Sequence, residues 1–153
     1  MLEIGGGSGA LALSIKQRGA RKVVATDISE KACAAMECNA LVNGLDLDVR
    51  CGNLFEPVHA HERFALVIFN LPLLDKPVAA PSEVALCDPN GDLLNSFLAG
   101  VREVCAPGGS ALFTHASISA PLPLITQGVL KIEKESFRND GEIFRVLSWR
   151  NSV

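Results

Sequence analysis

The chain has 153 residues, the size of one ordinary domain. Hydrophobic residues make up 48% of it and charged residues 20%, which excludes intrinsic disorder because a disordered chain has too few apolar groups to build a core. The formal net charge of −3 argues against a domain that grips bare nucleic acid by itself, since binding to phosphates needs a basic face.

Strands and helices alternate along the first part of the chain. A short strand, Leu2–Ile4, leads into a glycine cluster, and Ser29 is placed to cap a later helix. From apolar periodicity and from turn residues we predict a helix over about 8–18, a strand over 22–26 that ends at Asp27, a helix over about 30–42, and a strand over 48–51.

The second part of the chain begins with six continuous apolar residues, Phe64–Phe69, which is typical of a parallel strand covered on both faces. A loop over about 73–90 follows, and loops of this length are often functional. We then predict a helix capped by Asp92, a strand over 110–114, a short helix near 122–127, and two strands, 130–137 and 142–149, that form a hairpin at Asn139-Asp140-Gly141.

This order of elements indicates an α/β fold. We expect a mostly parallel, doubly wound sheet of about seven strands that ends in an antiparallel hairpin, because strands that alternate with helices build parallel sheets. No composition shift marks a domain boundary, so residues 1–153 are interpreted as a single domain.

The motif with the clearest chemistry lies where the first strand ends. Glu3 stands two residues before Gly5-Gly6-Gly7-Ser8-Gly9, which opens directly into a helix, and Asp27 ends the second strand. Glycines let the backbone approach a ligand closely, and an acid at the end of strand two is placed to accept ribose hydroxyls. An acid just ahead of the glycines repels a pyrophosphate and suits a cofactor with a cationic amino-acid end.

Glu3 and the Gly5–Gly9 loop resemble the first motif of class I S-adenosylmethionine (SAM) methyltransferases. Four further segments, 9–13, 19–29, 39–44 and 52–57, resemble the small-domain branch of that family. This branch contains the protein-glutamine N5-methyltransferases and related RNA and DNA amino-methyltransferases. Its members carry helices upstream of the first strand, so we expect a domain that lacks those usual upstream helices.

The resemblance implies a Rossmann-like fold that binds SAM and releases S-adenosyl-L-homocysteine, with no metal. Asp27 would hold the ribose, and Asn53, which stands where the family has an acid, would accept from the adenine amino group. The cofactor residues implied are Glu3, Gly5, Gly6, Gly7, Gly9, Asp27, Ile28, Asn53, Leu54 and Asn70.

On the acceptor side, the family signature Asn-Pro-Pro-Tyr corresponds to Asn70-Leu71-Pro72-Leu73. The resemblance implies catalytic roles for Asn70, Leu71 and Pro72. The side-chain oxygen of Asn70 and the carbonyl of Leu71 would accept the two hydrogens of a target amino group and aim its lone pair at the methyl group. Leu73 replaces the aromatic ring that stacks on planar substrates, which favours a non-planar or aliphatic acceptor.

We therefore predict a SAM-dependent methyltransferase that acts on a nitrogen acceptor, either protein glutamine or a small molecule, by in-line displacement. The altered signature also fits a catalytically degenerate SAM-binding module. A nucleic-acid amino-methyltransferase domain that needs a separate recognition domain ranks behind these because of the acidic charge, and a nicotinamide-dependent oxidoreductase ranks last.

The five cysteines contain no C-x-x-C pair, so we expect reduced thiols and no zinc site. The uncharged stretch 104–130 is broken by prolines and glycines, so we expect no membrane span. The start of the chain lacks the basic residues of a secretion signal. Together these features predict a cytoplasmic protein, and they leave its oligomeric state open.

Overall fold

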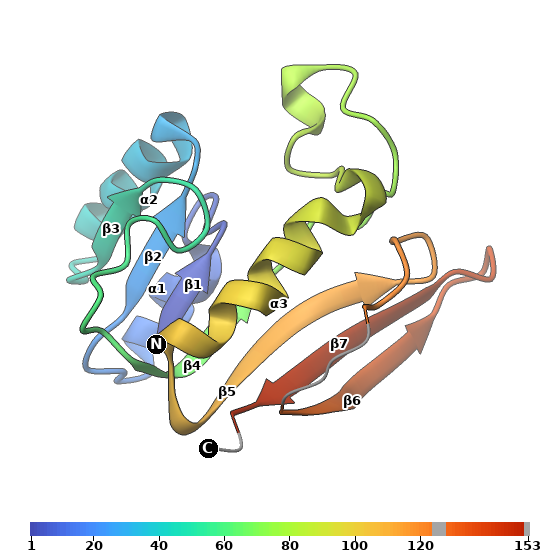
Figure 1. The fold of residues 1–153 in the computed structure, drawn as a ribbon. Coiled ribbons are helices and arrows are strands. Elements are labelled where there is room, and N and C mark those ends of the chain that lie inside the picture. Colours follow the sequence, from blue (N-terminus) through green and yellow to red (C-terminus); the bar gives the residue numbers. More distant parts are fainter. Residues whose placement is uncertain (124–127, 152–153) are drawn as a thin grey trace.

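The computed structural model describes residues 1–123 and 128–151 (Figure 1). Its strands are β1 (Leu2–Ile4), β2 (Val24–Asp27), β3 (Asp48–Cys51), β4 (Phe64–Phe69), β5 (Cys105–Ala116), β6 (Val129–Phe137) and β7 (Ile143–Arg150). Its helices are α1 (Ala10–Gln17), α2 (Glu30–Val42) and α3 (Asp92–Val104), with short 3₁₀ turns at Pro81–Glu83 and Pro89–Gly91.

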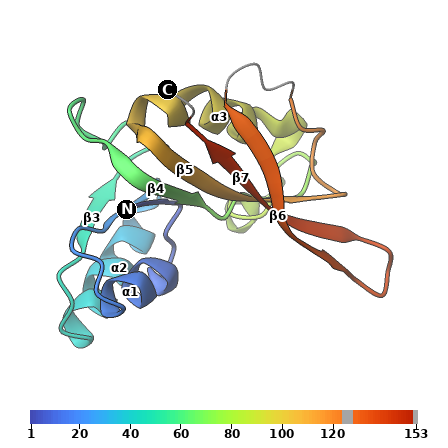
Figure 2. The same ribbon diagram turned by 90° about the horizontal axis from the view of Figure 1, so that it is seen from below.

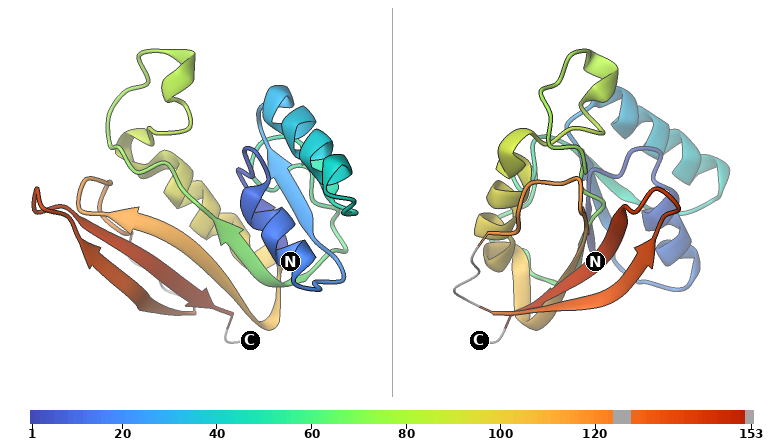
Figure 3. Two further views of the ribbon diagram at one scale, coloured as in Figure 1. Left: turned by 180° about the vertical axis from the view of Figure 1, so that it is seen from behind. Right: turned by 90° about the vertical axis from the view of Figure 1, so that its right-hand side faces the viewer.

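The strands form one seven-stranded sheet in the order β3-β2-β1-β4-β5-β7-β6. The first five in this order run parallel, and β7 pairs antiparallel with both β5 and β6. Helices α1 and α2 lie on one side of the sheet and α3 on the other (Figure 2). The predicted doubly wound sheet with a terminal antiparallel hairpin is therefore confirmed, and the hairpin extends away from the helices (Figure 3).

The larger part of the core lies between the sheet and α3. Phe97 is fully buried and its ring contacts Phe55, Phe69 and Phe113, with ring centroids 5.4–5.9 Å apart. Leu94, Val101 and Val104, the other buried residues of α3, follow the helical period. A second, smaller cluster packs α1 and α2 against β2 around the buried Met36. Within the described residues, no helix combines the length and the apolar character that crossing a membrane requires.

Three local predictions need correction. Asp92 does not cap α3: the buried carboxylate of Asp88 accepts from the N–H groups of Leu93 and Leu94 at 2.7 and 3.0 Å. Strand β5 begins at Cys105, before the strand start predicted at residue 110, because Phe64 already pairs with Cys105 there. Of the short helix expected near 122–127, residues 122–123 are not helical and 124–127 lie outside the described residues.

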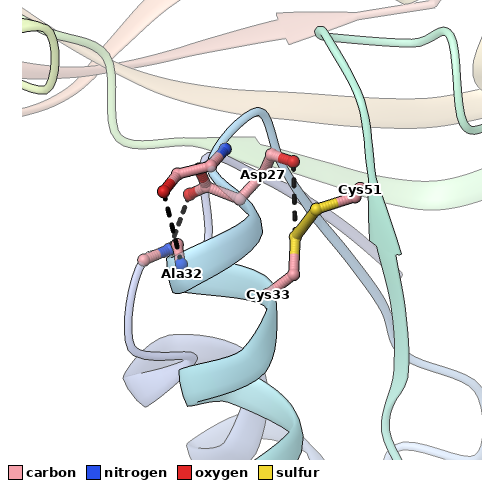
Figure 4. Close-up of a disulfide and its surroundings, with 6 residues drawn as sticks. Asp27, Ala32, Cys33 and Cys51 are labelled. Atoms are coloured by element: carbon pink, nitrogen blue, oxygen red, sulfur yellow. Dashed lines mark hydrogen bonds between the residues drawn. A yellow bond between two sulfur atoms is a disulfide. The ribbon is translucent and has the colours of Figure 1, made fainter.

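The expectation that all cysteines are reduced is wrong for two of them. Cys33, the fourth residue of α2, and Cys51, the last residue of β3, form a disulfide with their Cα atoms 6.1 Å apart (Figure 4). The parallel register places Cys51 opposite Asp27, and the sulfur of Cys33 lies 3.5 Å from the carbonyl oxygen of Asp27. The disulfide thus ties α2 and β3 together beside the end of β2.

Reduction of this disulfide should lower the free energy of unfolding by about 3 kcal/mol, because the bond closes a loop spanning a sequence separation of 18 and so restricts the unfolded chain. Urea denaturation with and without dithiothreitol measures the difference. Cys33→Ser should be less stable and insensitive to the reductant, whereas Cys38→Ser, which changes an exposed free thiol, should keep the wild-type response. Equal urea midpoints in both conditions would contradict the prediction.

Candidate active site

A pocket of about 380 Å³ opens at the carboxyl ends of the parallel strands. It lies where the strand order reverses between β1 and β4, the place where open α/β sheets bind ligands. Its volume is in the range of small-molecule sites. The residues that line it are Ile4, Gly5, Gly7, Thr26, Asp27, Ile28, Ser29, Ala32, Gly52, Asn53, Leu54, Phe69, Asn70, Pro72, Pro81, Ser82, Val84, Ala85 and Leu93.

The glycine loop shapes the floor of this pocket. Gly5, Gly7 and Gly9 have φ values of 65°, 57° and 78°, a left-handed conformation that residues with a Cβ rarely adopt. A Cβ built on Gly7 meets no protein atom within 4 Å, so the space beside this lining residue is free for a ligand. Gly6 faces away, since a Cβ there would lie 2.5 Å from the sulfur of Met36 in α2.

The carboxylate of Asp27 is fixed at the end of β2. Its two oxygens accept from the N–H groups of Gly7 and Ser29 at 3.0 and 2.9 Å. A carboxylate has about four acceptor positions, so both oxygens keep capacity for a ligand hydroxyl. Asp27 is the one ionisable side chain among the described lining residues, and it gives the pocket a single fixed negative charge.

Two apolar side chains stand beside Asn53 on the β2–β3 side of the pocket. Ile28 is 62% exposed although it follows a buried strand, and Leu54 has a φ of 45°, which is uncommon for a residue with a branched side chain. Both line the pocket together with Asn53, whose own N–H donates to Glu56 at 3.1 Å. This side of the pocket therefore presents apolar surface together with the Asn53 amide, which can supply a hydrogen-bond acceptor.

The altered signature lies on the opposite wall. Asn70 is exposed and lines the pocket with Pro72, whereas the side chain of Leu71 is buried in the core. The hydroxyl of Thr114, on β5, lies 3.2 Å from the side-chain oxygen of Asn70 and 3.4 Å from the carbonyl oxygen of Leu71. The structure thus brings the acceptor-side residues Asn70 and Pro72 into the same pocket as Asp27.

Glu3 has a different place from the other predicted cofactor residues. It is 5% exposed and absent from the pocket lining, and its carboxylate accepts from the N–H of Ala12 in the first turn of α1 at 2.8 Å. Burial, opposed by this hydrogen bond and aided by the charge of Asp27, raises the pKa of Glu3 to about 7. Gly6 and Gly9 also lie outside the lining, so Glu3 and these two glycines support the loop from behind.

The raised pKa of Glu3 predicts that stability falls as the pH rises from 4.5 to about 7. In this window the folded chain keeps a proton that the unfolded chain has lost, so the proton stabilises the fold, and above pH 7 that advantage is gone. Across this pH window the free energy of unfolding falls by about 3 kcal/mol in total. Urea denaturation at pH 5, 6, 7 and 8 should show this slope in the wild type and a flatter one in Glu3→Gln. The exposed Glu30→Gln is the control, and identical slopes in Glu3→Gln and wild type would contradict the assignment.

The sequence did not identify the side of the pocket that is formed by the 73–90 loop. Pro81, Ser82, Val84 and Ala85 reach the pocket from the middle of the 73–90 loop, which carried only a general expectation of function. The base of this loop is held by hydrogen bonds from the N–H groups of Leu73 and Leu74 to the carbonyl of Leu86. No local sequence signal identifies these residues, because their position depends on how the loop folds back over β4.

Comparison with known proteins gives a consistent result. A family model described as a methyltransferase domain matches residues 1–109. The ribosomal protein L11 methyltransferase of Caldicellulosiruptor bescii is 38% identical over 71 residues, covering 46% of this chain and 23% of that protein. The release factor glutamine methyltransferase of Bordetella pertussis is 30% identical over 126 residues, covering 75% of this chain and 47% of that protein. The chain therefore spans less than half the length of these curated relatives.

Solved structures share the fold. A 16S rRNA methyltransferase of T. thermophilus, in complex with AdoMet and guanosine, aligns with a TM-score of 0.74 at 20% identity, covering 98% of this chain and 36% of that one. A ribosomal protein L11 methylase of Lactobacillus delbrueckii subsp. bulgaricus aligns with a TM-score of 0.65 at 21% identity, covering 98% and 69%.

Proposed function

The chain belongs to the methyltransferase domain family, the class I enzymes that use SAM, and from this premise we propose that it transfers a methyl group from SAM to a nitrogen acceptor held at Asn70. One observation carries the proposal. Asn70 and Pro72 line the same pocket as Asp27 and the glycine loop, so a donor and an acceptor can meet inside it.

In this proposal the cofactor occupies the side of the pocket formed by β1, β2 and β3. Asp27 would accept from the ribose hydroxyls, Asn53 would accept from the adenine amino group, and the apolar side chains of Ile28 and Leu54 would contact the adenine ring. The open space beside Gly7 takes the amino-acid end. The fixed carboxylate and the exposed apolar side chains support this placement. We assign Glu3, Gly6 and Gly9 a role in holding the loop in shape.

The acceptor nitrogen lies against Asn70 and Leu71. The side-chain oxygen of Asn70 and the carbonyl oxygen of Leu71 each accept one hydrogen, which turns the nitrogen lone pair toward the cofactor. SAM would supply a methyl group activated by its positively charged sulfur. As the bond from nitrogen to the methyl carbon forms, the sulfur–methyl bond breaks to release S-adenosylhomocysteine, and the nitrogen gives up one hydrogen as a proton to water. The chain contributes orientation, which can supply about 7–11 kcal/mol in well-aligned reactions.

The surroundings of Asn70 favour an uncharged acceptor. Phe69 and Pro72, next to it in the chain, are apolar, as are Val84 and Leu93 in the same pocket lining, and a positively charged amine is costly to bury without a partner. A neutral small-molecule amine meets this condition and also agrees with the loss of the stacking ring at Leu73. The amide nitrogen of a protein glutamine is likewise uncharged, but its planar group would bind without that ring. The similarity to a release factor glutamine methyltransferase supports glutamine as the first acceptor to test.

The experiment has two parts. Isothermal titration with SAM, S-adenosylhomocysteine and NAD identifies the cofactor, and we expect binding of the first two and none of the third. Transfer of radiolabelled methyl is then measured to a release factor, ribosomal protein L11, a glutamine-containing peptide and a panel of neutral amines. SAM binding without transfer to any of them favours a catalytically degenerate SAM-binding module, for which the loss of two signature residues at Leu71 and Leu73 is the supporting observation.

The acidic net charge places nucleic-acid acceptors after protein and small-molecule acceptors. Methylation of rRNA in the same assay would reverse that order. We propose a cytoplasmic location on the ground that the named relatives act on a ribosomal protein and a release factor.

A further inference from the structure

The hydroxyl of Thr114 contacts both oxygen atoms that the proposed function gives to the acceptor. Phe69 pairs with Phe113 in the parallel ladder of β4 and β5, so the next residues, Asn70 and Thr114, lie beside each other where β4 ends and β5 continues. The Thr114 hydroxyl oxygen is 3.2 Å from the side-chain oxygen of Asn70 and 3.4 Å from the carbonyl oxygen of Leu71.

We propose that Thr114 is a positioning residue that orients the Asn70 amide and fixes its distance from the Leu71 carbonyl. The inference rests on the proposed function and adds to it a residue that lies outside the sequence signature and does not line the pocket. Thr114 acts through Asn70 and Leu71 and does not itself touch the acceptor.

Asn70 needs such a restraint because it is an exposed residue just past the end of a strand. The last torsion of an asparagine side chain is broad and roughly two-fold, so an unrestrained amide presents either its oxygen or its NH2 group to a ligand. A hydroxyl that donates to the oxygen holds that oxygen in place. The oxygen has two lone pairs, so one remains for a hydrogen of the acceptor.

Thr114 is itself held rigidly. It is half-buried in β5, which pairs with β4 on one side and with Val146 of β7 on the other. Its β-branched side chain has few rotamers. Thr114, a rigid strand residue, therefore orients Asn70 in the loop. Its hydroxyl has one proton that lies within reach of both the Asn70 side-chain oxygen and the Leu71 carbonyl oxygen, so it holds these two oxygens close to each other.

The same loop has a second hydroxyl contact that provides a matched control. Ser119 donates to the carbonyl oxygen of Leu73 at 2.9 Å and accepts from the N–H of Ala116 at 3.2 Å, and among the described residues no hydrogen bond joins it to Asn70 or Leu71. Beneath the loop, Thr114 and Ser119 line one small cavity of about 10 Å³, which is room for one water molecule at most.

The first test compares variants in turnover of a glutamine-containing peptide. Thr114→Val keeps the shape and the β-branch but removes the hydroxyl, and we expect roughly a tenfold lower kcat with unchanged SAM affinity. Thr114→Ser restores the hydroxyl and should recover most of the rate, and Ser119→Ala should stay within about threefold of wild type. A Thr114→Val enzyme with wild-type kcat overturns the inference.

A double-mutant cycle shows whether Thr114 works through Asn70. In an Asn70→Ala background the Thr114→Val change should cost much less than in the wild type, because residues that act together are not additive. Equal costs in both backgrounds overturn the inference, since Thr114 would then act independently.

A second readout needs no acceptor and separates this inference from the proposed function. NMR of the Asn70 side-chain NH2 group in the SAM-saturated protein should show a single ordered pair of signals, which broadens or averages in Thr114→Val and is kept in Thr114→Ser and Ser119→Ala. Unchanged Asn70 signals in Thr114→Val overturn the positioning role. If the wild type transfers no methyl group but these signals behave as expected, the proposed function fails and the positioning role stands.

Discussion

Replacing Asn70 with alanine is expected to lower kcat for methyl transfer by about 10²–10³-fold, the usual effect of removing one group that stabilises a transition state. The side chain is exposed to the pocket and contacts Thr114, and it packs in neither hydrophobic cluster, so its loss should not disturb folding. What disappears is an acceptor for one hydrogen of the target nitrogen, and with it the alignment of the lone pair.

The measurement is the initial rate of radiolabelled methyl transfer at saturating SAM, together with SAM affinity by titration. Affinity should stay within about threefold of wild type, since the proposed function gives the cofactor to residues after β1, β2 and β3 and assigns Asn70, which the sequence also suggested as a cofactor residue, to the acceptor. Asn43→Ala is the matched control, because Asn43 is also an exposed asparagine after a secondary-structure element but lies at the end of α2, outside the pocket lining. An Asn70→Ala protein with unchanged kcat would remove Asn70 from the proposed mechanism.

The second large effect concerns the cofactor. Asp27→Asn should weaken SAM binding by about 10²-fold, because hydrogen bonds to a charged group contribute about 1.5–3 kcal/mol each and the amide loses the charge as well as one acceptor position. In the wild type the N–H groups of Gly7 and Ser29 both donate to the Asp27 carboxylate. In the variant one of these two donors would face the NH2 group of the asparagine and would lose its acceptor.

Titration of SAM and S-adenosylhomocysteine into both proteins measures this effect. Asp46→Asn removes an exposed carboxylate between α2 and β3 that does not line the pocket, and it should bind SAM like the wild type. Thermal denaturation without ligand shows whether the loop still folds. Wild-type SAM affinity in a folded Asp27→Asn protein would mean that the ribose lies elsewhere.

Much of the fold could be predicted because its signals are local. The apolar run of β4, the cap at Ser29 and the turn at Asn139–Gly141 each lie within a few residues of the element that they define. The Ser29 hydroxyl accepts from the N–H of Ala32 as expected. Helix α2 and strands β3 and β4 have the predicted bounds.

The site was predicted only in part. Gly5, Gly7, Asp27 and Asn70 could be identified because each lies at the end of a strand or within three residues after it, and the ends of parallel strands meet at one edge. Thr114, Asp88 and the Cys33–Cys51 disulfide could not, because each depends on the register between segments that are distant in the sequence or on how a loop folds back. A sequence pattern predicts which residues lie near the end of a strand. Which of these residues contact one another depends on how the strands pair in the sheet.

The pairing of β1 with β4 has a consequence for how donor and acceptor are aligned. Among the described strands this ladder alone joins the two halves of the sheet, and it consists of three residue pairs, Leu2 with Val67, Glu3 with Ile68 and Ile4 with Phe69. One half carries Asp27 and the other carries Asn70. A slip of one residue along the ladder would shift them by about 3.3 Å, whereas an error of about 1 Å can already cost 10² in rate. In the proposed mechanism the alignment of donor and acceptor therefore depends on the buried side chains along this ladder, Leu2, Ile4 and Val67. Core substitutions there should slow methyl transfer although they leave Asp27 and Asn70 unchanged.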